Sequence, residues 1–352
     1  MPQLGLAVPI EGFSLRESLE LAVRAEALGF ESAWSYEVDV CDGFTPLGWL
    51  AARTERMRLG ISLIPAPSRP PALLAMTASG LQDISGGRLV LGLGASSPAV
   101  MRHWMGLTHD RPLTRLRETV EATRQALAGG RVSYTGETVR IDGFRLGGRP
   151  AEVPILLGAL GPKANRLAGA VADGLIMVFN VPERTPELLT EFYAGAEEAG
   201  RDHAELEVVS KVFVSVDEDL YALRPQLQRF VTGYAIVPAY QRLLRRQGFE
   251  AEMDALAAAW GEGRRADAAA AISDELLSAL IVFGSPEQCA ARLRAHGKNG
   301  VDTLIIAPIT AATEPAERRE RIEHTVHQVA SALTGDRSPA PHVDSPGSQS
   351  IN

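Results

Sequence analysis

The chain has 352 residues, 45% of them hydrophobic, and a formal net charge of −8 at pH 7. This length suits one α/β barrel with insertions, whereas an acidic balance without a lysine- and arginine-rich run argues against a nucleic-acid partner. No apolar stretch could span a bilayer, no signal-peptide pattern opens the chain, and two cysteines make no disulfide framework, so we expect a cytoplasmic protein.

Short apolar runs alternate with amphipathic stretches from the N-terminus onward. Leu4–Val8 predicts a strand. Ser14 and Glu17 have the spacing of a capping box at the start of a helix, which Gly29 ends. Glu31–Tyr36 predicts the second strand. Six further strands are predicted at Met57–Ile64, Arg88–Leu93, Pro154–Leu157, Gly174–Val178, Glu207–Val216 and Thr303–Ala307.

Helical patterns follow these strands. They are predicted near Pro46–Arg53, Ala72–Ile84, Leu113–Leu127, Lys163–Ala172, Pro186–Ala199, Pro286–Gly297 and Glu314–Leu333. Strands that alternate with helices indicate a parallel sheet. Because there are eight such strands, we interpret the chain as a closed (β/α)8 TIM barrel of the α/β class, with an open doubly wound sheet as the alternative.

Two stretches are longer than this alternation requires. Residues 132–146 contain Gly136, Gly143 and β-type residues, which predict a hairpin. Residues 217–280 hold several aromatic residues and an alanine-rich helix. They are expected to form a lid over the barrel mouth, and the alternative is extra packing or a dimer surface. Residues 1–335 then make one domain, and the Pro- and Ser-rich residues 336–352 are expected to be a disordered tail.

The functional loops of a parallel barrel follow the C-terminal ends of its strands. Glu37 stands in the loop after the second predicted strand, near Trp34, Tyr36 and Phe44. We predict that these three aromatic residues line a small-molecule substrate. An apolar neighbourhood would raise the pKa of Glu37 and suit it as a catalytic proton donor, and a solvated loop acid is the alternative.

His103 and Trp104 follow the loop after the fourth predicted strand. His103 is the second candidate for proton donor, although a lone histidine is more often structural, and Trp104 is a further candidate for substrate contact. His109 precedes a helix start, which favours a structural role. The sequence has no His, Cys and Glu spacing typical of a metal site, and no G-x-S-x-G nucleophile motif.

Small residues end the fourth and fifth predicted strands. Gly94, Ala95 and Ser96 would let a ligand approach the backbone closely. The other turn leads straight into a helix, whose N-terminus suits a phosphate, and its lysine would add charge. This turn consists of Ala159, Leu160, Gly161, Pro162 and Lys163. Ordinary tight turns are the alternative, because neither segment has dinucleotide-binding or Walker spacing.

Several ordered segments together resemble the bacterial luciferase-like monooxygenase superfamily, and in particular its branch that uses the deazaflavin coenzyme F420. The segments are AEALGFESAW at Ala25–Trp34, LGISLIP at Leu59–Pro65, SGGRLVLGLG at Ser85–Gly94, RPLTRLRE at Arg111–Glu118, GALGPKANRLAGAVADG at Gly158–Gly174 and GVDTLIIAP at Gly300–Pro308. They cover most of the chain from Leu4 to about Ala332.

The resemblance implies a (β/α)8 barrel that holds an isoalloxazine-like ring at its C-terminal mouth. It implies a non-proline cis peptide between Ser62 and Leu63 that supports one face of the ring. It also implies that Gly94, Ala95 and Ser96 border the cofactor, and that the segment Ala159–Lys163 borders its phosphate.

Two sites depart from the pattern of many F420 enzymes, one after the second predicted strand and one after the fourth. Tyr36 and Glu37 stand where these enzymes carry Asp-His, and Ser97 stands where some carry a glutamate. Sugar-phosphate dehydrogenation is therefore not expected. Hydride transfer from reduced F420 to a carbonyl, imine or activated alkene fits better, with Glu37 as the donor of the proton.

Two other functions stay open on this reading. An FMN-dependent monooxygenase would use the same barrel with a separate flavin reductase as partner. A barrel that binds a flavin without turnover belongs to a different functional class. Homodimers are common in the family, so the resemblance also implies a homodimer by analogy.

Overall fold

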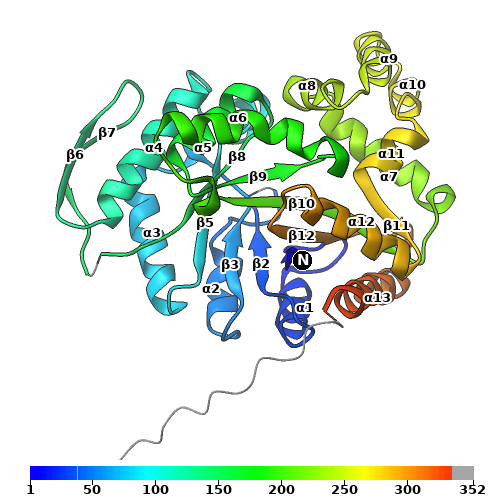
Figure 1. The fold of residues 1–352 in the computed structure, drawn as a ribbon, viewed down its shortest axis with the longest axis horizontal. Helices are drawn as coiled ribbons and strands as arrows, with labels where there is room; N and C mark the ends of the chain where they lie inside the picture. The colour runs from blue at the N-terminus through cyan, green and yellow to red at the C-terminus, as the bar shows by residue number, and fades with distance from the viewer. Residues whose placement is uncertain (38, 149, 335–352) are drawn as a thin grey trace, which may run out of the picture.

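A computed structural model describes residues 1–37, 39–148 and 150–334, and these residues form a parallel barrel surrounded by helices (Figure 1). Strand β12 pairs with β1, and β10 pairs with both β12 and β9, so the sheet closes on itself. The barrel strands are β1 (Gln3–Ala7), β2 (Ser32–Ser35), β3 (Arg58–Ile61), β5 (Leu89–Gly94), β8 (Ile155–Gly158), β9 (Gly174–Val178), β10 (Glu207–Val216) and β12 (Thr303–Pro308). The predicted (β/α)8 barrel is confirmed.

Helices cover the outside of the barrel. Each β-to-β connection must return the chain to the other end of the sheet, and a helix with one apolar face does so while it shields the strands. The outer helices are α1 (Leu15–Ala27), α2 (Thr45–Ala51), α3 (Pro71–Ile84), α4 (Pro112–Leu127), α5 (Pro162–Val171), α6 (Thr185–Glu198), α12 (Pro286–Lys298) and α13 (Pro315–Thr334). The predicted capping box is confirmed, because Ser14 and Glu17 bond reciprocally at the start of α1.

The predicted strand Met57–Ile64 is interrupted in the structure. Strand β3 ends at Ile61, and a two-residue strand, β4 (Ile64–Pro65), resumes the pairing with β5. The cis peptide bond predicted between Ser62 and Leu63 lies in the gap and is confirmed. A second cis bond, between Val8 and Pro9, lies directly after the end of β1 and was not predicted.

The first long insertion is the predicted hairpin, formed by β6 (Arg131–Thr135) and β7 (Arg140–Arg145), which projects from the barrel beside α3 and α4 (Figure 1). Its turn is fixed by Glu118 of α4. The carboxylate accepts bonds from the backbone N–H groups of Glu137, Thr138 and Val139 and from the Thr138 hydroxyl, at 2.6–2.9 Å. Burial by itself would raise the pKa of Glu118, but the four hydrogen bonds have the larger effect and lower this pKa to about 2.

The second insertion consists of five helices between β10 and the next strand. They are α7 (Leu220–Ala235), α8 (Pro238–Arg245), α9 (Glu250–Gly261), α10 (Arg265–Ala270) and α11 (Asp274–Leu280). The chain then adds a parallel strand that the sequence did not predict, β11 (Ile281–Gly284), which pairs with residues 213–216 of β10 outside the closed ring. This strand was missed because its four residues continue the apolar run of α11 without a turn signal.

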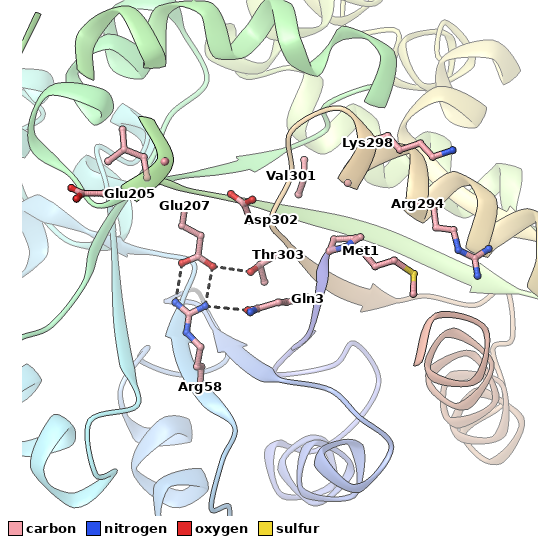
Figure 2. A pocket seen from close by; sticks show the side chains of 14 residues that line it. Met1, Gln3, Arg58, Glu205, Glu207, Arg294, Lys298, Val301, Asp302 and Thr303 are labelled. Carbon is pink, nitrogen blue, oxygen red and sulfur yellow. Dashed lines mark hydrogen bonds and ion pairs between the residues drawn. The ribbon is translucent and has the colours of Figure 1, made fainter. Parts of the chain in front are cut away.

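A cavity of about 740 Å³ lies at the N-terminal end of the barrel. Figure 2 shows Arg58 and Glu207 facing each other there, with Gln3 and Thr303 beside them. The Arg58 guanidinium binds the Glu207 carboxylate at 2.8 Å, and Thr303 donates to the same carboxylate at 2.7 Å. These residues begin their strands, so they close the bottom of the barrel, where residues serve stability and not catalysis.

None of the helices among the described residues combines the length and hydropathy that crossing a membrane requires. Within the same residues, no group of three or more His, Cys, Asp and Glu side chains is arranged to hold a metal ion. The tail predicted at 336–352 lies outside the described residues.

Candidate functional site

The segment between β3 and β4 is held at the C-terminal mouth by the end of β2. The Ser62 N–H donates to the Ser35 carbonyl at 2.6 Å, and the Glu37 N–H donates to the Leu63 carbonyl at 3.3 Å. Both peptide groups that flank the cis bond are thereby fixed to the neighbouring strand. The predicted cofactor residues Ser62 and Leu63 therefore occupy one defined position at the barrel mouth.

The Leu63 side chain is seated on two glycines that end the next barrel strands. A Cβ atom added to Gly158 would lie 1.9 Å from Leu63 Cδ2, and one added to Gly94 would lie 2.5 Å from Leu63 Cδ1. Real Cβ atoms do not come so close to a neighbour, so a side chain at either position would push the Leu63 side chain out of its place. The strand ends of β3, β5 and β8 thus converge on one half-buried leucine at the mouth.

The residues at this mouth fit a cofactor with a polar ring edge and a phosphate. Ser62 Oγ is buried and makes no hydrogen bond with any described residue, which leaves a hydroxyl to satisfy. Nearby in the fold, α5 begins at Pro162 after Gly161, without a side-chain cap. Its free N–H groups at Lys163 and Ala164 and the positive end of its dipole suit an anion.

A histidine side chain holds the turn that follows β5. His109 Nε2 lies 3.0 Å from the Ala95 carbonyl and 3.2 Å from the Ser96 carbonyl. Ser96 adopts a positive φ of 61°, a conformation that such bonding from outside the turn supports. His109 therefore has the structural role that its place in the sequence predicted, and it acts on the turn that the sequence assigned to the cofactor.

Glu37 does not lie in the apolar environment that the sequence predicted, and that prediction is wrong. Its carboxylate is bound by Arg69 at 2.9 Å, and it also accepts from the Ser68 hydroxyl at 3.2 Å and the Gly43 N–H at 3.3 Å. The carboxylate oxygens are therefore occupied as hydrogen-bond acceptors by three neighbouring groups. Sequence reasoning missed Arg69, which lies 32 positions away in a loop.

Trp34 does not line a substrate site, which corrects a second prediction. Its side chain is fully buried, and its Nε1–H donates to Ser32 Oγ at 2.9 Å. The ring fills the barrel interior over Gly5 and Gly60, where added Cβ atoms would lie within 2.7 Å of it. The indole is therefore a core residue with a satisfied N–H group.

The other predicted substrate residues lie in different surroundings. Phe44 is buried under the Arg69 guanidinium, whose carbon is 5.0 Å from the ring centroid. Tyr36 is half-buried, and its hydroxyl donates to the Pro9 carbonyl at 2.8 Å. His103 and Trp104 are exposed on a short π-helical turn, Val100–Trp104, and Trp104 keeps 61% of its surface. The structure does not bring His103 into contact with Glu37.

The helical insertion packs on the mouth through a cluster of aromatic rings. Phe179 follows β9 and Phe213 lies on β10, and their ring centroids are 5.4 Å apart. Phe230 and Tyr234 of α7 and Tyr240 of α8 contact Phe179 at 5.0–6.1 Å. The insertion helices therefore stand at the same end of the barrel as the predicted cofactor loops.

Two residues of the turn between α8 and α9 make polar contacts with the loops at this end of the barrel. Gln247 is buried, accepts from the Val181 N–H at 2.7 Å and donates to the Phe179 carbonyl at 2.9 Å. The Arg246 guanidinium donates to the Leu160 carbonyl, next to the uncapped start of α5. Sequence reasoning assigned no role to either residue, because only the fold brings the insertion to the fifth-strand turn.

Comparison with known proteins places this barrel in a family. The sequence profile of the luciferase-like monooxygenase family matches residues 2–303. The chain belongs to this family of oxidoreductases, and the predicted family is confirmed.

Individual relatives are more distant but cover most of the chain. The 5,10-methylenetetrahydromethanopterin reductase of Methanolobus tindarius is 30% identical over 298 residues, which are 83% of this chain and 90% of that protein. A putative coenzyme F420-dependent oxidoreductase of Mycobacterium tuberculosis is 31% identical over 312 residues, covering 82% and 89%. Among solved structures, coenzyme F420-dependent tetrahydromethanopterin reductase from Methanopyrus kandleri aligns with a TM-score of 0.79 at 23% identity, over 95% and 99% of the two chains. At that identity the likeness concerns the fold.

Proposed function

We propose that the protein is an F420-dependent oxidoreductase that reduces a carbonyl, imine or activated alkene of a small organic substrate. The observation that carries the proposal is the seat of Leu63 on Gly94 and Gly158, beside the uncapped start of α5. This arrangement offers a flat apolar support and an anion site at one barrel mouth. Two relatives are named as F420-dependent enzymes, which supports this coenzyme over FMN.

Each predicted cofactor residue has a distinct task in this proposal. Leu63 supports the ring face, and the free Ser62 hydroxyl bonds the ring edge. The turn Gly94–Ser96, held by His109, closes one side of the ring. The segment Ala159–Lys163 binds the phosphate through backbone N–H groups, with the Lys163 ammonium at its edge. When bound, reduced F420 supplies a hydride and reacts poorly with oxygen.

The protein's own contribution is to orient the substrate, exclude water and supply a proton. The aromatic cluster around Phe179 and Tyr234 provides an apolar roof over the mouth. The ion pair of Glu37 and Arg69 fixes the loop after β2, so Glu37 has a positioning role. A substrate without strong charge suits these walls.

The test is stopped-flow oxidation of reduced F420 by the full chain, with a panel of enones, imines and ketones under anaerobic conditions. We expect coenzyme oxidation that depends on one member of the panel and yields a two-electron-reduced product. Oxidation of reduced FMN by oxygen with an oxygenated product, and no reaction of reduced F420 with any member, would overturn the proposal in favour of the monooxygenase.

A further inference from the structure

Lys211 is an unusual residue for this chain. The sequence has 35 lysines and arginines, and only three of them are lysines, at positions 163, 211 and 298. Lys163 and Lys298 are exposed on helices, whereas Lys211 is partly buried in the middle of β10. A buried lysine can lose its proton, which an arginine cannot, so the residue type at position 211 permits proton release.

The side chain of Lys211 crosses the interior of the barrel toward its mouth. In the sheet, Lys211 pairs with Val178, the last residue of β9, and with Ile305 of β12. Its Nζ lies 4.0 Å from the ring centroid of Tyr36, which directly follows β2. Strands β10 and β2 are separated in the sheet by β12 and β1, so this contact passes through the barrel lumen. The ammonium group thus lies at the level where the strands end.

No carboxylate among the described residues forms an ion pair with Lys211. The contacts of its Nζ are two aromatic rings, Tyr36 at 4.0 Å and Phe213 at 5.6 Å. Ring faces offset part of the cost of burying a cation, and a thioether or alkyl chain would fill the same space without that cost. Stability alone therefore does not account for a lysine at this position.

The groups around Lys211 leave it as the readiest proton source. Burial lowers its pKa to about 8, whereas burial raises the pKa of Tyr36, Tyr234 and Tyr240. Burial also raises the pKa of Cys41 in the loop after β2. The carboxylates that act on Tyr36 are Glu11 and Asp39, and those that act on Cys41 are Glu37 and Asp42. Glu37 and Asp42 are both paired with Arg69.

We propose that Lys211 is the catalytic proton donor, and that it selects substrates whose reducible bond ends at an oxygen or nitrogen within reach of Nζ; this rests on the proposed function. As the substrate carbon receives hydride from reduced F420, the π electron pair of the C=O, C=N or conjugated bond moves to the heteroatom. One Nζ–H bond breaks and an O–H or N–H bond forms. Nζ is left as a neutral amine, which regains its proton from water.

The first test measures the protonation of Lys211 without turnover. Protein labelled with [ε-¹³C]lysine should give one carbon signal for each of its three lysines, and Lys211→Met identifies the signal of Lys211. We expect this signal to titrate near pH 8, well below the ordinary lysine value of about 10.4. A Lys211 signal that titrates at the ordinary lysine value would overturn the proposal.

The second test separates proton donation from charge. Lys211→Met removes the proton, and Lys211→Arg keeps the charge but not the ability to release a proton. Both variants should lower kcat by about 10²–10⁴-fold, with F420 affinity changed less than about threefold. Lys298→Met is the matched control, because Lys298 lies at the N-terminal end of the barrel, and this variant should have the kcat of the wild type.

The outcomes distinguish this inference from the proposed function. If wild-type protein reduces its substrate with F420 and Lys211→Met does so at the same rate, the inference is wrong and the proposed function stands. If wild-type protein neither binds F420 nor oxidises its reduced form, the proposed function is wrong and the inference is overturned with it. A loss of kcat in Glu37→Gln that matches Lys211→Met, with Lys211→Arg active, would assign the proton to Glu37 instead.

Discussion

At the scale of single residues, Gly161 offers a direct test of the phosphate site. It precedes α5, and an added Cβ atom there would meet nothing within 4 Å. Its φ of −135° is open to any residue, so the folded protein tolerates a side chain at this position. An effect of substitution therefore reports on a ligand and not on packing.

We predict that Gly161→Val weakens F420 binding by about 10–100-fold, because a branched side chain blocks the approach of the phosphate to N–H groups worth about 1.5–3 kcal/mol. Fluorescence titration measures the affinity, and urea unfolding should show unchanged stability. Gly147→Val is the matched control, because a Cβ atom at this glycine would also meet nothing within 4 Å. Equal F420 affinity in wild type and Gly161→Val would show that the phosphate does not bind at this turn.

Single residues also mark where sequence reasoning reached its limit. The cis bond at Ser62–Leu63 was predicted from the family resemblance, and Gly94 from the small residues that end the fourth predicted strand. Glu37 and Trp34 were misjudged because their surroundings come from distant strands and loops, Arg69 and Gly5 among them. Lys211 was not predicted to have a role, although it is one of only three lysines in the chain and the only one in a predicted strand.

At the scale of elements, the β6–β7 hairpin depends on one carboxylate. Glu118 of α4 is buried and accepts four hydrogen bonds from the hairpin turn. Its pKa is lowered from 4.5 to about 2, so its stabilisation is fully present above pH 4.5 and is lost as the pH falls through 2. The hairpin is therefore the element we expect to loosen first in acid.

We predict that Glu118→Gln lowers the free energy of unfolding by about 1–3 kcal/mol at pH 7, because the amide NH₂ cannot accept the bonds of the turn. The variant should also lose the part of the wild-type acid dependence that falls between pH 4.5 and 2. Urea unfolding as a function of pH measures both effects. Asp142→Asn, an exposed acid on β7, is the control; a loss no larger than in this control would contradict the assignment.

The elements were predicted well where the pattern was periodic. The eight barrel strands and the hairpin are present, because buried parallel strands and capped helices have strong local signals. Strand β11 was missed because Ile281–Gly284 joins α11 directly and pairs only with the distant end of β10. The position of the insertion also could not be read from the sequence, since contacts such as Gln247 with Phe179 link residues 68 positions apart.

At the scale of the whole molecule, the two ends of the barrel have different roles. The N-terminal end is closed by Arg58 and Glu207, which hold each other and their neighbours in fixed positions (Figure 2). The C-terminal end carries the Leu63 seat, the uncapped start of α5, Lys211 and the aromatic roof of the insertion. Stability and chemistry are thereby separated along the barrel axis, as in other enzymes of this fold.

The central claim is that this mouth is built for F420, and a parallel equilibrium titration of the purified chain with F420 and with FMN tests it most directly. Fluorescence of each cofactor reports its binding, and Gly161→Val serves as the variant that should weaken the tighter of the two. The account predicts that F420 binds with an affinity higher than that of FMN by on the order of tenfold or more, a difference of about 1.4 kcal/mol or more. Tight binding of FMN with no detectable binding of F420 would contradict it.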